Sequence, residues 1–402
     1  MQHFFCSLTE MIRELKEKND KEKATKLAVL CFHELVSDME RFFSEIEEFN
    51  LIGTFEGDSL LATVGTYDFQ IFIRNQLLDC AGVAYVMTDP VYRRKGKVKE
   101  LMNKILLDSK AKGYPVSALW PFEHDFYRKF GFEKFEKTTT FKFKPGQIKS
   151  DFKLKDNYQV EEVTNTKDYQ PLIQIATKAQ KKWNRVISKT AAWMVRGPLQ
   201  NFKMYLFKRD NDPVAYICIN FKKVGEWDYD MKIMDMAFID TDAKHSLFAF
   251  IRNFSADITK VHLNLPYTEE VESYLDSVLE DCKFNQWPAM LRILDIKKSF
   301  ESLAYPTNLK KNLLFYVEDP LIKENSGVWQ LAIENGKCVA HKVDTPKENE
   351  RVLQLTLLEL SQLLSGYASI DKILEHKNVL IPKEWLDKHL FPEVQTAVMV
   401  WF

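Results

Sequence analysis

Residues 82–102 read GVAYVMTDPVYRRKGKVKELM. The stretch begins as an apolar strand, and basic side chains then surround a single glycine, Gly96: Arg93, Arg94, Lys95, Lys97 and Lys99. Like charges at this spacing repel one another and add nothing to an apolar core, so a partner of opposite charge is the natural explanation. The residues alone leave a second interpretation open, a solvated basic face on a surface helix.

The local structure expected at this glycine favours an anion. A strand that passes through a turn into a helix leaves the first N–H groups of the helix unpaired, and the helix dipole adds roughly half a positive charge there. Because Gly96 has no Cβ, a phosphate can approach the backbone closely. The pattern therefore predicts an anion site that fits a pyrophosphate.

The residues on both sides of this stretch predict an α+β fold. Apolar side chains follow the glycine at helical spacing and form a stripe that can pack on a sheet: Val98, Leu101, Met102, Ile105 and Leu106. Upstream, short apolar or alternating runs from Leu51 onward indicate an antiparallel meander. Downstream, YPVSALWP at 114–121 indicates a strand. A short helix ending at Gly131 and a strand of alternating Thr and Phe then lead to Pro-Gly at 145–146.

The rest of the chain suggests a repeat and a third unit. Residues 8–50 are charged and helical in period, with a capping-box pattern at Ser7-x-x-Glu10, and predict two helices. Residues 151–290 repeat the order of helical and strand-like segments but lack the basic glycine loop. Further strands and helices from Met290 onward predict an α+β domain. The predicted domains are residues 1–146, 147–289 and 290–402.

The composition limits the function classes. A chain of 402 residues is expected to form two or three cores. The 56 Lys plus Arg nearly balance the 57 Asp plus Glu, and the net charge of −1 argues against a general nucleic-acid binder or a polybasic membrane-surface protein. The six cysteines form no C-x-x-C and no signal-peptide pattern opens the chain, so free thiols and a cytoplasmic location are expected.

Membrane and metal sites are not expected either. No apolar run approaches the ~20 residues that a membrane-spanning helix needs. The eight histidines show no H-E-x-x-H and no zinc-like spacing, which predicts no metal.

Three motifs in this order resemble a known family. The opening stretch, then YPVSALWP, then FYRKFGF at 126–132 resemble the acetyl-CoA-binding core of GCN5-related N-acetyltransferases (GNAT), whose Arg-rich glycine loop holds the coenzyme pyrophosphate. More narrowly, the whole chain resembles the Eis (enhanced intracellular survival) family, and VQTA at 394–397 is also typical of it. The resemblance implies tandem GNAT-like domains, the second degenerate, followed by a sterol-carrier-like α+β domain.

The resemblance also implies the residues of the site. It assigns contacts to the acetyl-pantetheine arm to Val86, Met87 and Thr88. It assigns the pyrophosphate loop to Arg94, Lys95, Gly96, Lys97, Val98 and Lys99, and further coenzyme contacts to Phe122 and Glu123. Tyr127 matches the family's general acid, and the general base, the carboxylate of the last residue, falls on Phe402.

The sequence departs from the family pattern in two places. Val98 stands where acetyltransferase loops often have Gly or Ala, and Lys97 stands where this family often has an aliphatic residue. The tail VMVWF lacks the acidic residue that some members carry just before the end, which puts the substrate preferences of those members in doubt here.

Ordinary pKa values explain why acetyl transfer needs both groups. A lysine-like amine of pKa ~10.4 is protonated at neutral pH, so a base must remove a proton. An α-carboxyl of pKa ~3.3–3.7 is a weak base in water, but a terminus desolvated by Val398, Val400 and Trp401 would be stronger, and a relaying water is an alternative. A tyrosine of pKa ~10 protonates a thiolate of pKa ~8.5 against a mismatch of roughly 2 kcal/mol.

Two functions remain open at this stage. The first is acetyl-CoA-dependent transfer to a primary amine, with an aminoglycoside, a polyamine or a peptide or protein lysine as acceptor. The second is a non-catalytic protein that binds CoA or an apolar ligand such as a lipid and keeps a vestigial site. The resemblance also implies a homo-oligomer, commonly a hexamer. An acidic group in the second domain either attracts a polycation or is a solvated strand edge: Glu226, Asp228, Asp230 and Asp235.

Overall fold

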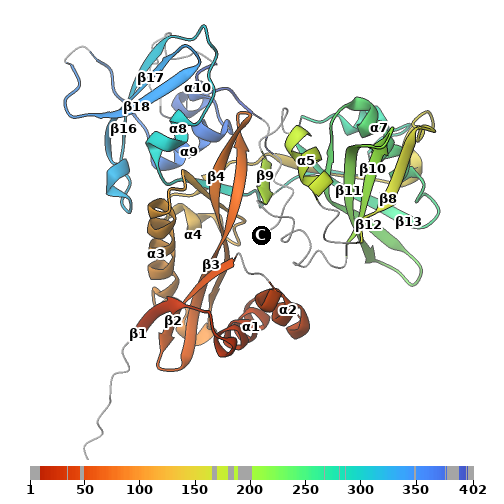
Figure 1. The fold of residues 1–402 in the computed structure, drawn as a ribbon, viewed down its shortest axis with the longest axis horizontal. Coiled ribbons are helices and arrows are strands. Elements are labelled where there is room, and N and C mark those ends of the chain that lie inside the picture. Colours follow the sequence, from red (N-terminus) through yellow and green to blue (C-terminus); the bar gives the residue numbers. More distant parts are fainter. Residues whose placement is uncertain are drawn as a thin grey trace, which may run out of the picture.

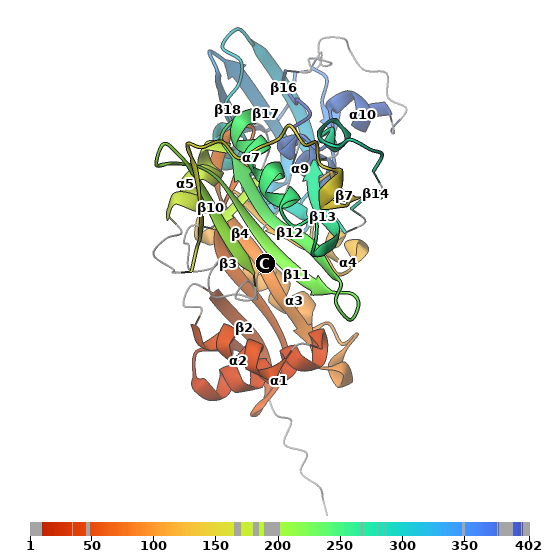
Figure 2. The ribbon, with the colours of Figure 1, turned by 90° about the vertical axis from the view of Figure 1, so that its right-hand side faces the viewer.

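The computed structural model describes residues 10–33, 35–45, 49–164, 170–179, 185–188, 202–266, 268–279, 281–285, 287–347, 350–375, 377, 389–394 and 396. In this part of the chain three mixed or antiparallel sheets are each packed against helices (Figure 1 and, turned by 90°, Figure 2). The predicted α+β class, with two GNAT-like units followed by a sterol-carrier-like unit, is confirmed.

The described helices are α1 (Lys18–Phe32), α2 (Val36–Glu45), α3 (Lys97–Ala111), α4 (His124–Arg128), α5 (Gln170–Ala179), α7 (Thr241–Arg252), α8 (Ile296–Glu301), α9 (Leu357–Ser365) and α10 (Ile370–Glu375). The strands of the first sheet are β1 (Glu10–Glu14), β2 (Phe49–Glu56), β3 (Ser59–Ile73), β4 (Gln76–Thr88), β5 (Val116–Leu119), β6 (Glu133–Lys134), β9 (Arg185–Ser188) and β15 (Met290–Ile293). The strands of the second sheet are β7 (Thr138–Phe143), β8 (Tyr158–Glu162), β10 (Lys203–Arg209), β11 (Asp212–Lys223), β12 (Tyr229–Phe238), β13 (Ile258–Pro266) and β14 (Asp281–Phe284). The third sheet has β16 (Lys311–Val317), β17 (Gly327–Glu334), β18 (Lys337–Val343) and β19 (Leu353–Gln354).

The first sheet has the order β1-β2-β3-β4-β5-β15-β6, with β9 paired to β3. Its strands are antiparallel except for β4 and β5, which run parallel because helix α3 connects them. The apolar stripe of α3 packs on one face through Leu101, Met102 and Ile105. Helices α1 and α2 pack on the other face through Leu27 and Phe43. Burial of the α3 stripe confirms the helix that the spacing predicts.

Two strands lie in a different sheet from their neighbours in the sequence. Strand β7, just before the Pro-Gly at 145–146, pairs with β13 and β14 in the second sheet. Strand β15, which starts at Met290, pairs with β5 and β6 in the first sheet. The two units therefore exchange a strand, and the boundaries proposed after residues 146 and 289 stay predictions.

The C-terminal unit packs directly on the first sheet (Figure 1). One continuous apolar cluster contains Phe69 and Ile71 of β3 together with Phe315 of β16 and Leu363 of α9. At the β3–β4 turn, buried Arg74 donates hydrogen bonds to the Leu390 carbonyl at 2.9 Å and the Leu363 carbonyl at 2.6 Å. These contacts hold the chain after α10 against the first sheet.

The N-terminal prediction is partly wrong. Helices α1 and α2 form as expected, but Glu10–Glu14 is an edge strand paired antiparallel to β2 rather than the start of a helix. Ser7 lies outside the described residues. Backbone pairing to an existing edge therefore overrides the local helical pattern at Glu10.

Candidate active site

Strand β4 is bulged where the predicted acetyl-pantetheine contacts begin. Its register against β3 shifts just after Thr63. Tyr85 has a positive φ of 50°, and its carbonyl accepts a hydrogen bond from the Thr63 hydroxyl at 3.0 Å. A bulge leaves an extra residue unpaired and turns the strand. As a result Val86 belongs to the apolar cluster under α3, whereas Met87, 1 % exposed, belongs to the cluster on the opposite face.

The two parallel strands also part at this point. The ladder between β4 and β5 ends at Val83 and Leu119, although β4 continues to Thr88. In the described part of the chain, residues 84–88 therefore have no strand partner on the β5 side. Apart from the Tyr85 and Thr88 carbonyls, which accept side-chain hydrogen bonds, the backbone groups on this side are open to an extended ligand that enters between the strands.

The glycine loop and the start of α3 form the anion site that the sequence predicts. Gly96 is the N-cap of α3 with φ 80°, and no side chain caps the helix there. A Cβ placed on Gly96 would meet nothing within 4 Å, so the space in front of it is open. Arg94 also has a positive φ, of 62°, which makes a left-handed turn immediately before the helix. Open N–H groups at a helix N-terminus surrounded by cations bind anions.

The basic side chains around this loop differ in how free they are. Arg94, Lys95 and Lys99 are exposed, and the Lys95 ammonium lies 4.8 Å from the centre of the Tyr92 ring. Lys97 is different because its ammonium forms an ion pair with Glu10 of β1, which raises the pKa of Lys97. Half-buried Val98 packs against the apolar cluster under α3. The arginine and the two exposed lysines are therefore the cations ready for a ligand.

Arg93 and Thr88 connect the loop to β4. The Thr88 carbonyl accepts hydrogen bonds from Arg93 Nε at 3.4 Å and from Cys31 Sγ at 3.6 Å. Asp89 accepts from the Val91 N–H at 2.9 Å and so starts the short turn that leads to the loop. The end of the strand and the anion site are thus held at a fixed spacing by side chains and turn geometry.

Tyr127 lies in α4 and belongs to the apolar cluster against which Val86 and Val98 pack. The residue is 2 % exposed, and burial raises the pKa of its phenol above the ordinary value. Its ring contacts the ring of Phe122 at 5.3 Å and that of Phe126 at 5.0 Å. No described residue forms a hydrogen bond with its hydroxyl. A buried, protonated phenol beside β4 that has no hydrogen-bond partner among the described residues can donate a proton or a hydrogen bond to a ligand.

Phe122 and Glu123 occupy the start of α4. Phe122 is 61 % exposed and covers Tyr127 from the solvent side. Glu123 is the N-cap of the helix, and its carboxylate accepts from the Asp125 N–H at 3.4 Å. Phe402 lies outside the described residues.

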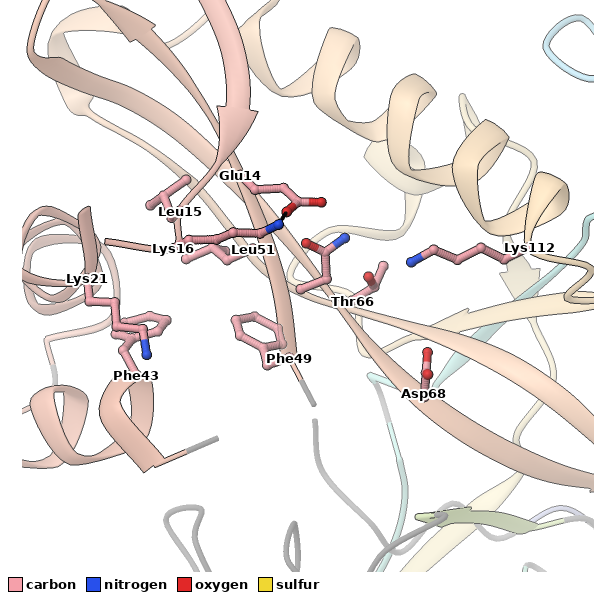
Figure 3. Close-up of a pocket in the computed structure, with 11 residues that line it drawn as sticks. Glu14, Leu15, Lys16, Lys21, Phe43, Phe49, Leu51, Thr66, Asp68 and Lys112 are labelled. Atoms are coloured by element: carbon pink, nitrogen blue, oxygen red, sulfur yellow. Dashed lines mark ion pairs between the residues drawn. The ribbon is translucent and has the colours of Figure 1, made fainter. Parts of the chain in front are cut away.

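A pocket of about 430 Å³ opens beside the bulge, on the side of α1 and α2 (Figure 3). Its Phe43 and Phe49 rings lie 5.2 and 5.3 Å from the ring of Tyr85. Leu15 and Leu51 add apolar surface, and polar side chains line the rest, including an ion pair between Glu14 and Lys16. The others are Lys21, Asn50, Thr66, Asp68 and Lys112. The sequence alone does not predict this pocket, because its walls come from segments up to about a hundred residues apart.

The second unit has the corresponding helix but a filled N-terminus. Helix α7 joins β12 to β13 as α3 joins β4 to β5. Its N-cap Asp240 accepts from the Ala243 N–H at 2.8 Å and from Arg209 at 2.8 Å. Asp242 accepts from Lys155 and, at 2.7 Å, from Tyr158. Carboxylates of the protein itself occupy the position that an anion takes at α3, so the second unit has no open anion site at this helix.

The four acidic residues singled out in the second unit, Glu226, Asp228, Asp230 and Asp235, do not form one exposed acidic patch. Asp235 is buried and accepts from the Tyr216 hydroxyl at 2.6 Å, and Asp230 pairs with His262 at 2.9 Å. A polycation site there is not supported.

Comparisons with known proteins agree with this geometry. Residues 11–135 match the family model described as an acetyltransferase (GNAT) domain, and residues 296–389 match a sterol carrier protein domain. The chain therefore carries a GNAT acetyltransferase domain followed by a sterol carrier protein domain. The expectation of an N-acetyltransferase is confirmed, and the alternative of a non-catalytic binding protein is not supported. Members of this family use acetyl-CoA.

Individual relatives are distant. An uncharacterized N-acetyltransferase of Streptomyces avermitilis is 23 % identical over 306 residues, which cover 70 % of this chain and 71 % of that protein. Among solved structures, a GCN5-related N-acetyltransferase from Anabaena variabilis has a TM-score of 0.83 at 19 % identity, over 98 % of this acetyltransferase and 100 % of that chain. Eis1 from Mycobacterium abscessus has a TM-score of 0.76 at 15 % identity, over 98 % and 100 %. The architecture is therefore Eis-like.

The structure bears on three further expectations: membrane spans, metal sites and free thiols. No helix in the described residues is long and apolar enough to cross a membrane. Within the same residues, no group of His, Cys, Asp and Glu side chains is placed to hold a metal ion, and the absence of a metal stays a prediction. The cysteines that the structure describes are free thiols: Cys31, Cys80, Cys218, Cys282 and Cys338.

Proposed function

We propose that the protein transfers the acetyl group of acetyl-CoA directly to a primary amine, with Tyr127 as general acid and the C-terminal carboxylate of Phe402 as general base. The C–N bond forms as the C–S bond breaks; the base takes a proton from the amine and the acid gives one to the departing thiolate. The observation that carries this proposal is the open N-terminus of α3 on the same side of β4 as the buried Tyr127.

The residues of the first unit fit the coenzyme. The space in front of Gly96 is open, and Arg94, Lys95 and Lys99 are exposed around it, which suits a pyrophosphate. The backbone of residues 84–88, which has no described strand partner on the β5 side, suits the extended pantetheine arm. When bound, acetyl-CoA supplies an acetyl thioester. Lys97 contributes less in this proposal because Glu10 already neutralises it.

The environment of Tyr127 suits an acid rather than a base. Burial raises the pKa of the phenol, so it stays protonated at neutral pH. Burial also widens the difference between the pKa of the phenol and the thiolate pKa of ~8.5. The phenol therefore donates its proton only as negative charge develops on the sulfur. General-acid help of this kind is worth ~10²–10⁴ in rate.

The described part of the C-terminal tail is firmly attached, which supports a fixed role for the chain end. Buried Arg74 holds the Leu390 carbonyl, the Val394 N–H donates to the Gly366 carbonyl at 2.9 Å, and Thr396 is buried. A carboxylate that follows such a segment is restrained, and desolvation would raise its proton affinity.

The pocket beside Tyr85 is the proposed acceptor site. The faces of Phe43 and Phe49 attract a cationic or partly apolar amine. Its lining carries three lysines, Lys16, Lys21 and Lys112, against two carboxylates, Glu14 and Asp68, and Glu14 is paired with Lys16. The remaining positive excess favours an acceptor that has a carboxylate near its amine over a polycation. A lysine-type acceptor with its own carboxylate, such as free lysine or a short lysine peptide, is therefore preferred here over an aminoglycoside or a polyamine.

The experiment is thiol release from acetyl-CoA with a panel of amines that includes an aminoglycoside, a polyamine and a lysine peptide. It compares the native chain with Tyr127→Phe and with a chain extended by a few residues beyond Phe402. We expect amine-dependent turnover that falls ~10²–10⁴-fold in both variants while acetyl-CoA still binds. Full turnover in Tyr127→Phe would refute the acid, and full turnover in the extended chain would refute the base.

The same preparation tests two further parts of the proposal. Light scattering distinguishes a hexamer from smaller assemblies. Limited proteolysis with mass spectrometry tests the domain boundaries after residues 146 and 289. Because β7 and β15 are exchanged between sheets, we expect cleavage near these boundaries to leave the fragments associated.

A further inference from the structure

An almost completely buried ion pair connects the C-terminal unit to the first sheet. Arg292 of the exchanged strand β15 donates two hydrogen bonds from Nη2 to the carboxylate of Asp319, both at 2.9 Å. The two side chains are 1 % and 0 % exposed. Asp319 is itself fixed, because it accepts from the Leu321 and Ile322 N–H groups and from the Asn325 amide, each at 3.0 Å. The carboxylate is thus a rigid anchor for the guanidinium.

The other end of the guanidinium contacts the turn that follows α4. Arg292 Nη1 donates to the carbonyl of Phe130. The Phe130 and Phe132 N–H groups in turn donate to the Tyr127 carbonyl at 2.9 and 3.3 Å. A chain of hydrogen bonds therefore runs from Asp319 through Arg292 to the backbone of Tyr127. In the described residues, Tyr127 has no side-chain hydrogen bond that would place it otherwise.

Gly131 shows how closely the guanidinium is packed against this turn. It has φ 84°, and a Cβ there would lie 2.0 Å from Arg292 Nη1 and 2.7 Å from a methyl group of Leu357 in α9. Any side chain at this position would displace the guanidinium from the carbonyl of Phe130. The turn, the guanidinium and α9 fit together only without a side chain at Gly131.

Stability alone is a weak explanation for this pair. Among the described residues Arg292 Nε is buried without a hydrogen-bond partner, and a buried ion pair is seldom more stabilising than apolar side chains of the same volume. The pair does fix the orientation of the Arg292 guanidinium, because a planar guanidinium bound by both oxygens of a carboxylate has one orientation. That orientation points at the turn that follows α4, the helix that carries the Tyr127 phenol.

We propose that Arg292 and Asp319 are positioning residues for Tyr127, so that the sterol carrier protein domain sets the place of the acid in the acetyltransferase site. This inference rests on the proposed role of Tyr127. In this role the pair acts without touching substrate, by fixing the turn at the C-terminal end of α4. A displacement of about 1 Å at a reacting group can cost ~10²-fold in rate, which sets the scale of the effect.

The test is a double-mutant cycle on kcat with acetyl-CoA and the best amine of the panel. Asp319→Asn should lower kcat about 10- to 100-fold in the native background. Its KM for acetyl-CoA should stay within about twofold, because the loop at Gly96 is untouched. In a Tyr127→Phe background the same substitution should lower the residual kcat less than about twofold, since it acts through the missing hydroxyl.

Two further variants separate positioning from folding. Gly131→Ala displaces the guanidinium without removing a charge and should give the same kcat loss and the same dependence on Tyr127. Glu269→Gln is the matched control: it breaks the Lys244–Glu269 pair, whose side chains are 8 % and 17 % exposed, in the second unit away from α4. It should lower the melting temperature and leave kcat unchanged.

Each outcome decides the inference. An equal fractional loss in the native and Tyr127→Phe backgrounds, or native kcat in a folded Asp319→Asn or Gly131→Ala protein, would overturn the positioning role. If Tyr127→Phe is itself fully active, the proposed acid is wrong and the positioning role fails with it. If Tyr127→Phe is impaired and only the Arg292 and Asp319 effects are absent, the proposed function stands without this inference.

Discussion

Replacing Gly96 by alanine separates the folding of the glycine loop from its binding of anions. With φ 80°, an alanine at this position costs about 1–2 kcal/mol of backbone strain. Nothing lies within 4 Å of the new Cβ, so no clash adds to this cost. For a domain of roughly 150–250 residues, each kcal/mol lowers the melting temperature by about 2–4 °C. We therefore expect Gly96→Ala to lower the melting temperature by about 2–8 °C.

The effect of Gly96→Ala on binding should be larger. The methyl group enters the space through which a phosphate reaches the N–H groups of α3. Loss of one hydrogen bond to a charged group costs about 1.5–3 kcal/mol. This corresponds to an increase of about 10- to 150-fold in the Kd for acetyl-CoA. Isothermal titration calorimetry measures it directly.

The control lies at the other end of the same helix. Gly113 has φ 91°, and a Cβ there meets only the flexible Lys298 ammonium at 3.0 Å. Gly113→Ala should therefore show a similar fall in melting temperature and an unchanged Kd. If Gly96→Ala and Gly113→Ala bind acetyl-CoA equally well, the phosphate does not approach Gly96 and the reasoning is refuted.

Three other predictions follow from the charges. Because Lys97 is already paired with a carboxylate, Arg94→Gln should raise the Kd for acetyl-CoA about tenfold and Lys97→Gln less than about threefold; equal effects in calorimetry would contradict this. Burial raises the pKa of Tyr127, so the phenol stays protonated and kcat should not fall with rising pH below about pH 10; a decline near pH 8–9 that is absent in Tyr127→Phe would argue against it. The hydrogen bond from Lys155 lowers the pKa of Asp242 from 3.8 to about 2, so this carboxylate stabilises the fold above pH 3.8 and loses that contribution as the pH falls through about 2. After allowance for its solvent exposure the contribution is about 1 kcal/mol, and thermal unfolding of Asp242→Asn should differ from the native chain at pH 7 and converge with it towards pH 2.

Much of the fold could be predicted because its signals are local. The apolar stripe of α3 and the strands before it can be recognised from the spacing of apolar side chains. This spacing involves only residues that are close in the sequence. The start of β1 could not be predicted, because Glu10–Glu14 pairs with an edge strand some forty residues away and the pairing overrides its helical pattern. The family motifs pointed to an acetyltransferase, and the matching domain models confirm that activity.

The candidate site also has parts that the sequence predicts and parts that only the tertiary structure decides. Gly96 and its basic neighbours are contiguous, so the sequence by itself determined the open, cationic N-terminus of α3. The bulge at Tyr85, the pocket beside it and the buried contact of Arg292 with the turn after Tyr127 were decided only by the tertiary structure. Each of these needs segments that are distant in the chain to meet, and the exchange of β7 and β15 between sheets brings such segments together. Side-chain period describes which face of an element is buried, but not which other element buries it.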